Sequence, residues 1–345
     1  MDTLSQNDCE RIWIFEPYTP DLRQVWDEFV RTSRNGTFLC ERAYMEYHAD
    51  RFEDASMLAY RKGRLVGLLP ACRLQDGTLC SHAGLTYGGW ILPPSPLDGA
   101  MLLEMFDEWI AHCRTAGYTA IDYKPLPDIY AAVPSQEDLY ALWRCGFTMT
   151  GANLSSAIDL RGEWKFNMSK RQQLRKALKH NPVIERTGDF APFWAVLERC
   201  LAERHEAAPV HNLQEISLLA DRFPDNIALW TLSDEEGLQA GVVIYDTGLV
   251  AHSQYAATTA RARDRYYLTA LYHHLLTEVY ASRRYFDFGT SNESGGRVLN
   301  PGLLNQKYSM GATGVLYPRF KFEITNDKLQ MPRCNAAGAK SICNL

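Results

Sequence analysis

The chain has 345 residues, which is enough for two domains of ordinary size, and 46% of them are hydrophobic. A net charge of −5 argues against a surface built throughout to bind polyanions. The nine cysteines form no C-x-x-C pair, so we expect no metal and no dithiol redox site. The acidic N-terminus and the lack of about 18 consecutive apolar residues predict a cytoplasmic protein without stable membrane insertion.

The first half, residues 1–150, reads as a mixed α/β unit. Lys62-Gly63 predicts a tight hairpin, and apolar residues at helical spacing before Gly117 predict a core-facing helix that ends there. The predicted strands cover 11–15, 56–62, 64–72 and 118–123, and the predicted helices cover 21–33, 41–50 and 98–116.

The second half, residues 151–324, begins with a strand, followed by a basic helix that we expect Ser169 to cap and Asn181-Pro182 to end. Its predicted helices cover 170–180, 190–206, 212–223 and 265–281, and its strands cover 154–160, 227–233, 239–246, 249–257, 284–288 and 313–317. Residues 325–345 are polar and without periodicity, and we expect them to be disordered.

The two halves repeat one order of strand, turn, strand, helix and strand. Gly67 matches Gly241, His82 matches His252, and Asp122 matches Asp287. Only two copies exist, which favours a duplicated α/β (α+β) domain over a solenoid. Each copy should form a mixed, mostly antiparallel, twisted sheet flanked by helices.

Four segments sharpen this interpretation: SHAGLTYGG (81–89), RHEAAPVH (204–211), YFDFGTSNE (285–293) and LNPGLLNQKYSMGA (299–312). Together they resemble the FemAB-like branch of the GNAT acyltransferase superfamily, which includes the aminoacyltransferases that build peptidoglycan bridges. The resemblance covers residues 10–322. It implies two tandem GNAT-like domains and transfer of an acyl group onto an amine, with acyl-CoA or aminoacyl-tRNA as donor.

The sequence departs from the GNAT pattern where CoA normally binds. A glycine-rich turn usually lets backbone N–H groups approach the pyrophosphate there. Residues 261–268 contain no glycine, and prolines occupy the corresponding turn of the first half. Arg263 and Arg265 could still bind an anion through their side chains.

Four residues are candidate catalytic groups, each with a structural alternative. Asp287 could bind or deprotonate the acceptor ammonium, or it could cap the turn that follows its strand. Lys307 resembles the family's loop lysine and could stabilise a phosphate or an oxyanion, or it could be an exposed loop residue. His205 could transfer a proton and Tyr255 could protonate the leaving group, or both could be buried structural residues.

Further residues are candidates for binding. The glycine-rich loop and the ends of the second-half elements should contact substrate; these residues are His82, Thr86, Tyr87, Arg204, His211, Gln254, Ser291 and Asn300. Arg171 and Arg175 lie four residues apart on the basic helix and could attract an anionic partner such as tRNA, or they could be a solvated face.

We therefore expect an N-acyltransferase. Its acceptor should be an amine of a small molecule or of a cell-envelope or polysaccharide precursor. An acetyl-CoA-dependent N-acetyltransferase and a non-catalytic ligand-binding protein remain as alternatives.

Overall fold

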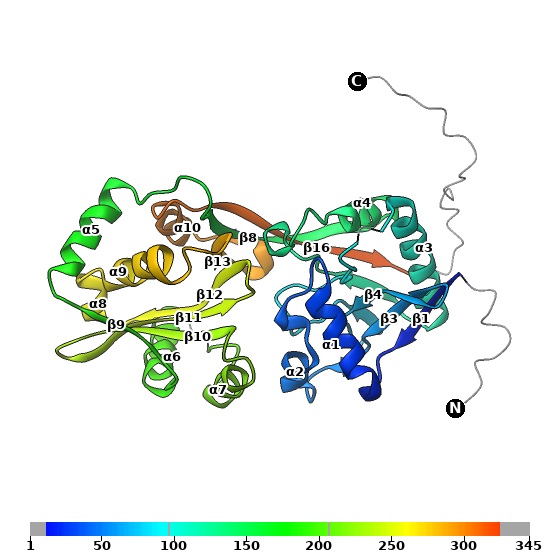
Figure 1. The fold of residues 1–345 in the computed structure, drawn as a ribbon, viewed down its shortest axis with the longest axis horizontal. Helices are drawn as coiled ribbons and strands as arrows, with labels where there is room; N and C mark the ends of the chain where they lie inside the picture. Colours follow the sequence, from blue (N-terminus) through cyan, green and yellow to red (C-terminus); the bar gives the residue numbers. More distant parts are fainter. Residues whose placement is uncertain (1–11, 96, 206–207, 325–345) are drawn as a thin grey trace, which may run out of the picture.

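The computed structural model describes residues 12–95, 97–205 and 208–324, without the side chains of Arg204 and His205. Two α/β halves lie side by side along the long axis (Figure 1). The expected disorder at 325–345 falls outside the described residues.

The strands are β1 (Trp13–Pro17), β2 (Glu53–Asp54), β3 (Met57–Arg61), β4 (Arg64–Leu69), β5 (Cys72–Arg73), β6 (Thr78–Cys80), β7 (Ala120–Tyr123), β8 (Thr148–Asp159), β9 (Val183–Thr187), β10 (Ile227–Asp234), β11 (Gly237–Asp246), β12 (Val250–Thr258), β13 (Tyr285–Thr290), β14 (Asn292–Glu293), β15 (Val298–Leu299) and β16 (Thr313–Glu323). The α-helices are α1 (Arg23–Thr32), α2 (Arg42–Met45), α3 (Gly99–Thr115), α4 (Glu137–Arg144), α5 (Met168–Leu178), α6 (Ala191–His205), α7 (Leu213–Arg222), α8 (Ala260–Asp264), α9 (Tyr267–His274) and α10 (Pro301–Tyr308). Short helical turns are η2 (Pro20–Leu22), η3 (Phe38–Cys40), η4 (Glu46–His48), η5 (Asp128–Tyr130), η7 (Ser294–Gly296) and the π-helical η6 (Leu275–Val279).

One 11-stranded, mostly antiparallel sheet runs through both halves in the order β2-β5-β6-β7-β16-β8-β13-β12-β11-β10-β9. The final strand β16 inserts between β7 of the first half and β8, which is why it extends well beyond the predicted 313–317. The domain boundary predicted between residues 150 and 151 falls within β8. The two halves therefore share backbone hydrogen bonds along their seam.

The repeated unit is visible in both halves. An antiparallel hairpin, β3–β4 or β10–β11, precedes a short parallel pair, β6–β7 or β12–β13. The halves differ because β3 and β4 form a separate sheet with β1. An isolated β-bridge between Leu68 of β4 and Ile91 links this sheet to the loop after β6. The parallel register pairs His252 with Asp287 and Cys80 with Asp122. Cys80, and not His82 as the sequence match predicted, is thus the counterpart of His252.

Several predicted elements need correction. Asn167, whose side chain accepts from Lys170 N, caps α5 in place of Ser169. The helix predicted over 265–281 is found as α9 followed by the π-helical η6. Tyr266, with a left-handed φ of 59°, separates it from α8, which was not predicted. The short helix α4 and strand β9 were not predicted.

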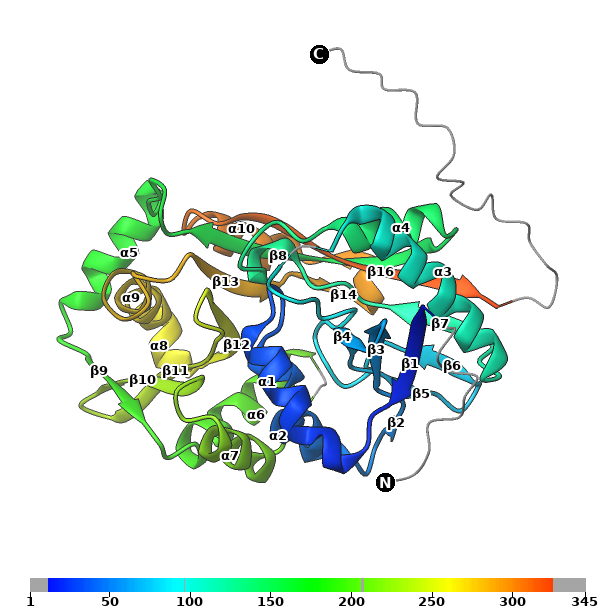
Figure 2. The same cartoon turned by 45° about the vertical axis from the view of Figure 1, so that its right-hand side comes forward.

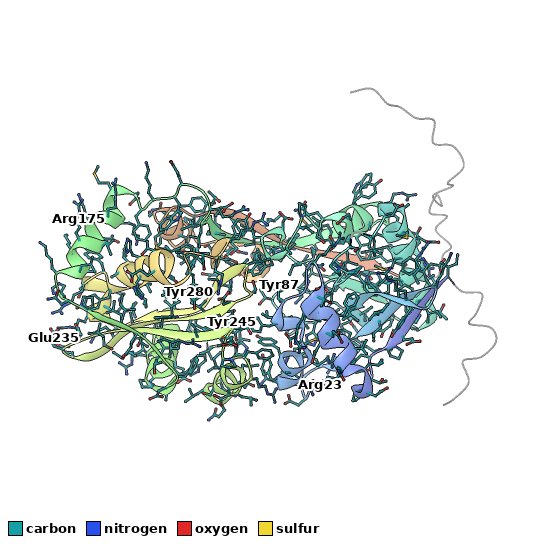
Figure 3. All side chains as sticks on the ribbon, viewed as in Figure 1. Arg23, Tyr87, Arg175, Glu235, Tyr245 and Tyr280 are labelled. Atoms are coloured by element: carbon teal, nitrogen blue, oxygen red, sulfur yellow. The ribbon has the colours of Figure 1, made fainter. Side chains whose placement is uncertain are left out.

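Helices cover both faces of the second-half sheet, with α5, α8 and α9 on one side and α6 and α7 on the other (Figures 1 and 2). One hydrophobic core crosses the seam. Phe38 and Tyr44 of the first half pack against Phe223 and Tyr245 of the second, with ring centroids 5.4–6.2 Å apart. Tyr245 and Tyr87 lie near the junction of the halves (Figure 3). This shared core fixes the relative position of the groups that converge at the seam.

Candidate functional site

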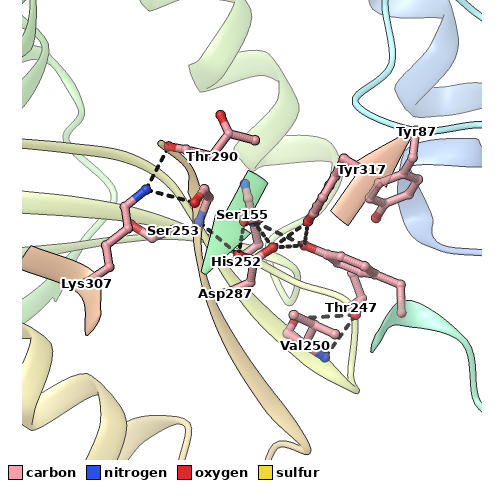
Figure 4. Close-up of polar contacts among 12 residues, drawn as sticks. Tyr87, Ser155, Thr247, Val250, His252, Ser253, Asp287, Thr290, Lys307 and Tyr317 are labelled. Carbon is pink, nitrogen blue, oxygen red and sulfur yellow. Dashed lines mark hydrogen bonds and ion pairs between the residues drawn. The ribbon is translucent and has the colours of Figure 1, made fainter. Parts of the chain in front are cut away.

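A buried hydrogen-bond network surrounds Asp287 at the seam (Figure 4). Its carboxylate is fully buried and accepts from the hydroxyl groups of Tyr130 (2.8 Å), Ser155 (2.5 Å) and Tyr317. The backbone N–H of Gly289 donates to the same carboxylate at 2.9 Å. These donors come from η5, β8, β13 and β16, so both halves contribute to one polar centre.

His252 completes the network. Its Nδ1 lies 3.1 Å from the Asp287 Oδ2 and 3.1 Å from the Tyr130 hydroxyl. β12 and β13 pair only over three residues each, and His252 and Asp287 are the last partners before the strands separate. The pair therefore sits where the two parallel strands β12 and β13 separate, and the carboxyl ends of parallel strands are where α/β sheets place ligands.

The charge state of Asp287 follows from its contacts. Burial acts to raise the pKa of Asp287, but the His252 imidazole and the hydrogen bonds from Ser155 and Tyr317 outweigh it and hold that pKa well below its usual range. An ionised carboxylate can only accept, so Nδ1 of His252 must carry the proton that faces it. When Nδ1 carries the only proton of the ring, Nε2 is left to accept one.

Lys307 lies beside this network but not on the predicted exposed loop. It is in the last turn of α10, a helix that Asn300 caps and Pro301 opens, and it is 6% exposed. Its Nζ donates to the carbonyl oxygens of Gly289 (2.8 Å) and Thr290 (2.7 Å), so it holds the end of β13 in place. Burial lowers the pKa of Lys307 to about 8, against the opposing effect of Asp287.

Tyr255 and His211 form a second polar pair, with Tyr255 Oη 2.6 Å from His211 Nδ1. The His211 ring lies 5.3 Å from Tyr47, which stacks on His48, and His48 lies 5.2 Å from His82. The three histidines are at most 4% exposed. Both nitrogens of His48, Nδ1 of His82 and Nε2 of His211 have no hydrogen-bond partner among the described residues.

The other predicted substrate contacts fall into two groups. Tyr87 is buried and donates to Thr37 Oγ1 at 3.2 Å, and its ring packs 4.8 Å from Tyr130, at the edge of the network. Ser291 is fully buried beyond β13, and Gln254 occupies the bulge in β12. Thr86 is exposed on its loop, and the Asn300 side chain caps α10. The side chains of Arg204 and His205 lie outside the described part of the chain.

The predicted anion-binding arginines occupy two sites. Arg265 and Arg261 form ion pairs with the acidic turn at Asp234 and Glu235. Arg263 donates to the backbone oxygen of Thr258 at 3.2 Å. Arg171 and Arg175 are exposed on α5, which packs against α9. No group of three or more potential metal ligands occurs among the residues that the structure describes.

A hollow of about 470 Å³ lies along η2 and α1, lined by residues that include Asp21, Gln24 and Glu28. It contains none of the groups described above, so we do not assign the chemistry to it. Within the described ranges, no helix is long and apolar enough to cross a membrane.

Comparisons with known proteins agree with this architecture. Residues 165–294 match the family model described as an acetyltransferase (GNAT) domain. The chain is similar to the crystal structure of FemX, with a TM-score of 0.64 and 14% identity over 90% of this chain and 97% of FemX. It is also similar to L-PGS from Bacillus licheniformis, with a TM-score of 0.56 and 12% identity over 91% of this chain and 94% of that one. A conserved protein of unknown function from Bacteroides thetaiotaomicron VPI-5482 gives a TM-score of 0.57 at 12% identity, over 89% and 98% of the two chains.

This chain has a FemAB-like GNAT acyltransferase fold. A search of curated proteins finds no match. The FemX alignment spans both halves, in agreement with the predicted tandem GNAT-like architecture.

Within this FemAB-like fold, most of the residues that surround Asp287 were not predicted from the sequence. Tyr130, Ser155 and Tyr317 belong to segments far from residue 287 in the chain, and none stands in a recognisable motif. His252 did carry a signal, because the internal repeat matched it to a residue near the end of a strand. Its role becomes visible only through the parallel register with Asp287.

Proposed function

We propose that this protein is an N-acyltransferase that moves an aminoacyl or acyl group onto an amine of a cell-envelope or polysaccharide precursor. The observation that carries the proposal is the His252–Asp287 pair at the point where β12 and β13 separate. The FemAB-like fold supports the reaction class, since it supplies the sheet opening in which this pair lies.

Acyl transfer requires that the acceptor amine lose a proton before or during attack. His252 Nε2 takes this proton, and Asp287 fixes the ring and stabilises the imidazolium that forms. The amine nitrogen then bonds to the acyl carbon, and the bond from that carbon to the donor's oxygen or sulfur breaks. The imidazolium returns its proton to the leaving group, so the histidine is regenerated.

Lys307 and Tyr255 have supporting roles in this proposal. Because two carbonyl oxygens of β13 occupy the Lys307 ammonium, we assign it as a positioning residue that keeps the Asp287–Gly289 turn in shape. Tyr255 lies three residues after His252 on β12, beyond the bulge, and is partly exposed. Its hydroxyl is a candidate for a second proton transfer through His211.

The donor is better matched by an aminoacyl ester than by acyl-CoA. The turn that binds the CoA pyrophosphate in GNAT proteins has no glycine here, and its arginines Arg261 and Arg265 are engaged by the carboxylates of Asp234 and Glu235. An acidic turn at this place repels a pyrophosphate. These residues do not fit CoA, and we propose aminoacyl-tRNA as the donor class.

The proposal is tested by incubating purified protein with aminoacyl-tRNA or acetyl-CoA and a panel of amine acceptors, including nucleotide-linked peptides and amino sugars. Mass spectrometry should detect a new amide with the aminoacyl ester and not with acetyl-CoA. Transfer of neither group to any acceptor would contradict the function, and transfer from acetyl-CoA alone would contradict the donor.

A further inference from the structure

The helix α5 presents a basic face that the proposed chemistry does not use. Between Glu163 and Glu185 the chain carries no carboxylate and six cations: Lys165, Lys170, Arg171, Arg175, Lys176 and Lys179. Five of the six are exposed and Lys170 is half-buried. None of the six side chains has an ion-pair partner among the described residues, whereas ion pairs occur elsewhere on the surface. The local charge thus opposes the net charge of −5 of the whole chain.

The basic face of α5 also contains exposed apolar side chains. Ala177 and the partly buried Leu174 turn inward, against α9. Met168, Arg171, Arg175 and Leu178 repeat at three- and four-residue spacing on the outward side. Met168 is 69% exposed and Leu178 is 51% exposed. Arg175 lies at the outer edge of the molecule (Figure 3).

A second set of exposed apolar side chains begins near the start of this helix and extends toward the middle of the molecule (Figure 1). It consists of large side chains on the β14–β15 hairpin, α10 and β16: Val298, Leu299, Leu303, Tyr308 and Leu316. We call it the apolar patch. Tyr308 Oη lies close to Gly314 of β16, and the hairpin turn packs on β8. The backbone N–H of Asn167 donates to Ser309 O at 2.9 Å, which joins the start of α5 to the end of α10. α10 lies between α5 and β8 in both views (Figures 1 and 2).

We propose that the basic face of α5 and the apolar patch together dock this protein on an anionic lipid bilayer. Lysine and arginine side chains bind acidic headgroups, while exposed Leu, Val and Met side chains enter the interfacial region. Nucleic acid explains the cations only, because phosphate contacts leave the aliphatic side chains unused and the face lacks interleaved aromatic residues. A second copy of this chain fits poorly, since a two-fold contact would bring one basic face against another.

This surface adjoins the candidate active site. The patch hairpin follows β13 directly, with Ser291 N donating to Leu154 O and Asn300 N donating to Ser291 O. Docking would therefore bring the strand end that holds Asp287 close to acceptors at a membrane surface. That consequence rests on the proposed function, whereas the docking itself does not.

The test is co-sedimentation of the full chain with vesicles of phosphatidylglycerol and phosphatidylcholine in equal parts, beside vesicles of phosphatidylcholine alone. Wild-type protein should bind the anionic vesicles and not the neutral ones. The double variant Arg171→Gln/Arg175→Gln should lower the partition coefficient by about 30-fold, from roughly 1 kcal/mol per cation. The variant Val298→Ser/Leu316→Ser should lower it about tenfold, since two exposed apolar side chains no longer enter the interface.

The matched control is Lys62→Gln/Arg64→Gln, which removes two exposed cations from the β3–β4 hairpin in the other half. It should bind like wild type, and the melting temperatures of all variants should confirm that each is folded. Equal binding to both kinds of vesicle, binding to neither, or an α5 variant no weaker than the control would overturn the proposal. The proposal would also be overturned if the protein bound tRNA but not the vesicles, and if the variant Arg171→Gln/Arg175→Gln lost the tRNA binding.

Discussion

His252 and Asp287 are direct partners in the parallel β12–β13 ladder, and Nδ1 of the imidazole lies 3.1 Å from Oδ2 of the carboxylate. Cys80 and Asp122 hold the same register in the first half. There the carboxylate forms an ion pair with Arg319. The duplicated scaffold thus keeps an aspartate at both strand ends but places a proton-accepting ring beside only one of them.

Asp287→Asn should reduce turnover at least about 100-fold, because the neutral amide cannot stabilise an imidazolium at His252. Asp122→Asn is the matched control. It removes the equivalent carboxylate and weakens the Arg319 contact, so it should lower the melting temperature and leave turnover near the wild-type value. Steady-state kinetics and thermal unfolding of both variants measure the contrast. Equal activity losses in the two variants would argue that the Asp287 carboxylate is structural only.

Lys307→Met should lower the free energy of unfolding by about 1–3 kcal/mol, because two buried carbonyl oxygens lose their donor. Turnover should fall as well if the end of β13 shifts. Lys165→Met, at an exposed lysine near Gly311, is the control and should change neither quantity. Wild-type stability and turnover in the Lys307 variant would contradict the positioning role.

Three histidines are buried, and we therefore expect the folded protein to lose stability in mild acid. Burial, aided by nearby positive charges, lowers the pKa of His48 and of His211 to about 4 and that of His82 to about 3. The neighbouring charged groups are Arg42, Asp50, Arg51, Asp54 and Lys124.

The unfolded chain binds a proton at each of these rings below pH of about 6.5, and the folded chain does not. Stability is therefore present at neutral pH and falls by about 1.4 kcal/mol per pH unit for each ring as the pH drops toward 4. Denaturant unfolding at pH 7 and pH 5 should show this loss, and His48→Leu should make it smaller by one ring's share. An unchanged pH dependence in His48→Leu would show that His48 is not held neutral.

Acetyl-CoA should not raise the melting temperature, because the acidic turn at Asp234 and Glu235 occupies the arginines that would bind its pyrophosphate. A ligand at 100 times its Kd would add about 2.7 kcal/mol of stability. Thermal unfolding with and without saturating acetyl-CoA is the measurement. A clear upward shift would show that the turn rearranges to bind CoA.

Local signals in the sequence predicted the local structure well. Lys62-Gly63 forms the expected hairpin with φ values of 48° and 76°, and the helix before Gly117 ends as expected. The Asp287 capping alternative also holds in part, since the carboxylate accepts from Gly289 N. These features depend on residues close together in the chain, which pattern and turn chemistry describe directly.

Long-range contacts could not be predicted in the same way. Tyr130 and Tyr317 reach Asp287 only because β16 returns to pair with both β7 and β8, and no spacing in the sequence encodes that return. Lys307 was expected on a loop because Pro301-Gly302 suggests a turn. Asn300 and Pro301 instead act as the N-cap and first residue of a helix, which buries the lysine.

Chemical rescue of His252→Ala tests the central claim most directly. With an amine acceptor and an aminoacyl donor, we predict that His252→Ala loses at least about 100-fold in turnover and that added imidazole restores part of it. A small imidazole replaces a missing proton acceptor but repairs no fold. Wild-type turnover in His252→Ala, or a loss that imidazole leaves unchanged while the variant is folded, would contradict proton transfer by His252.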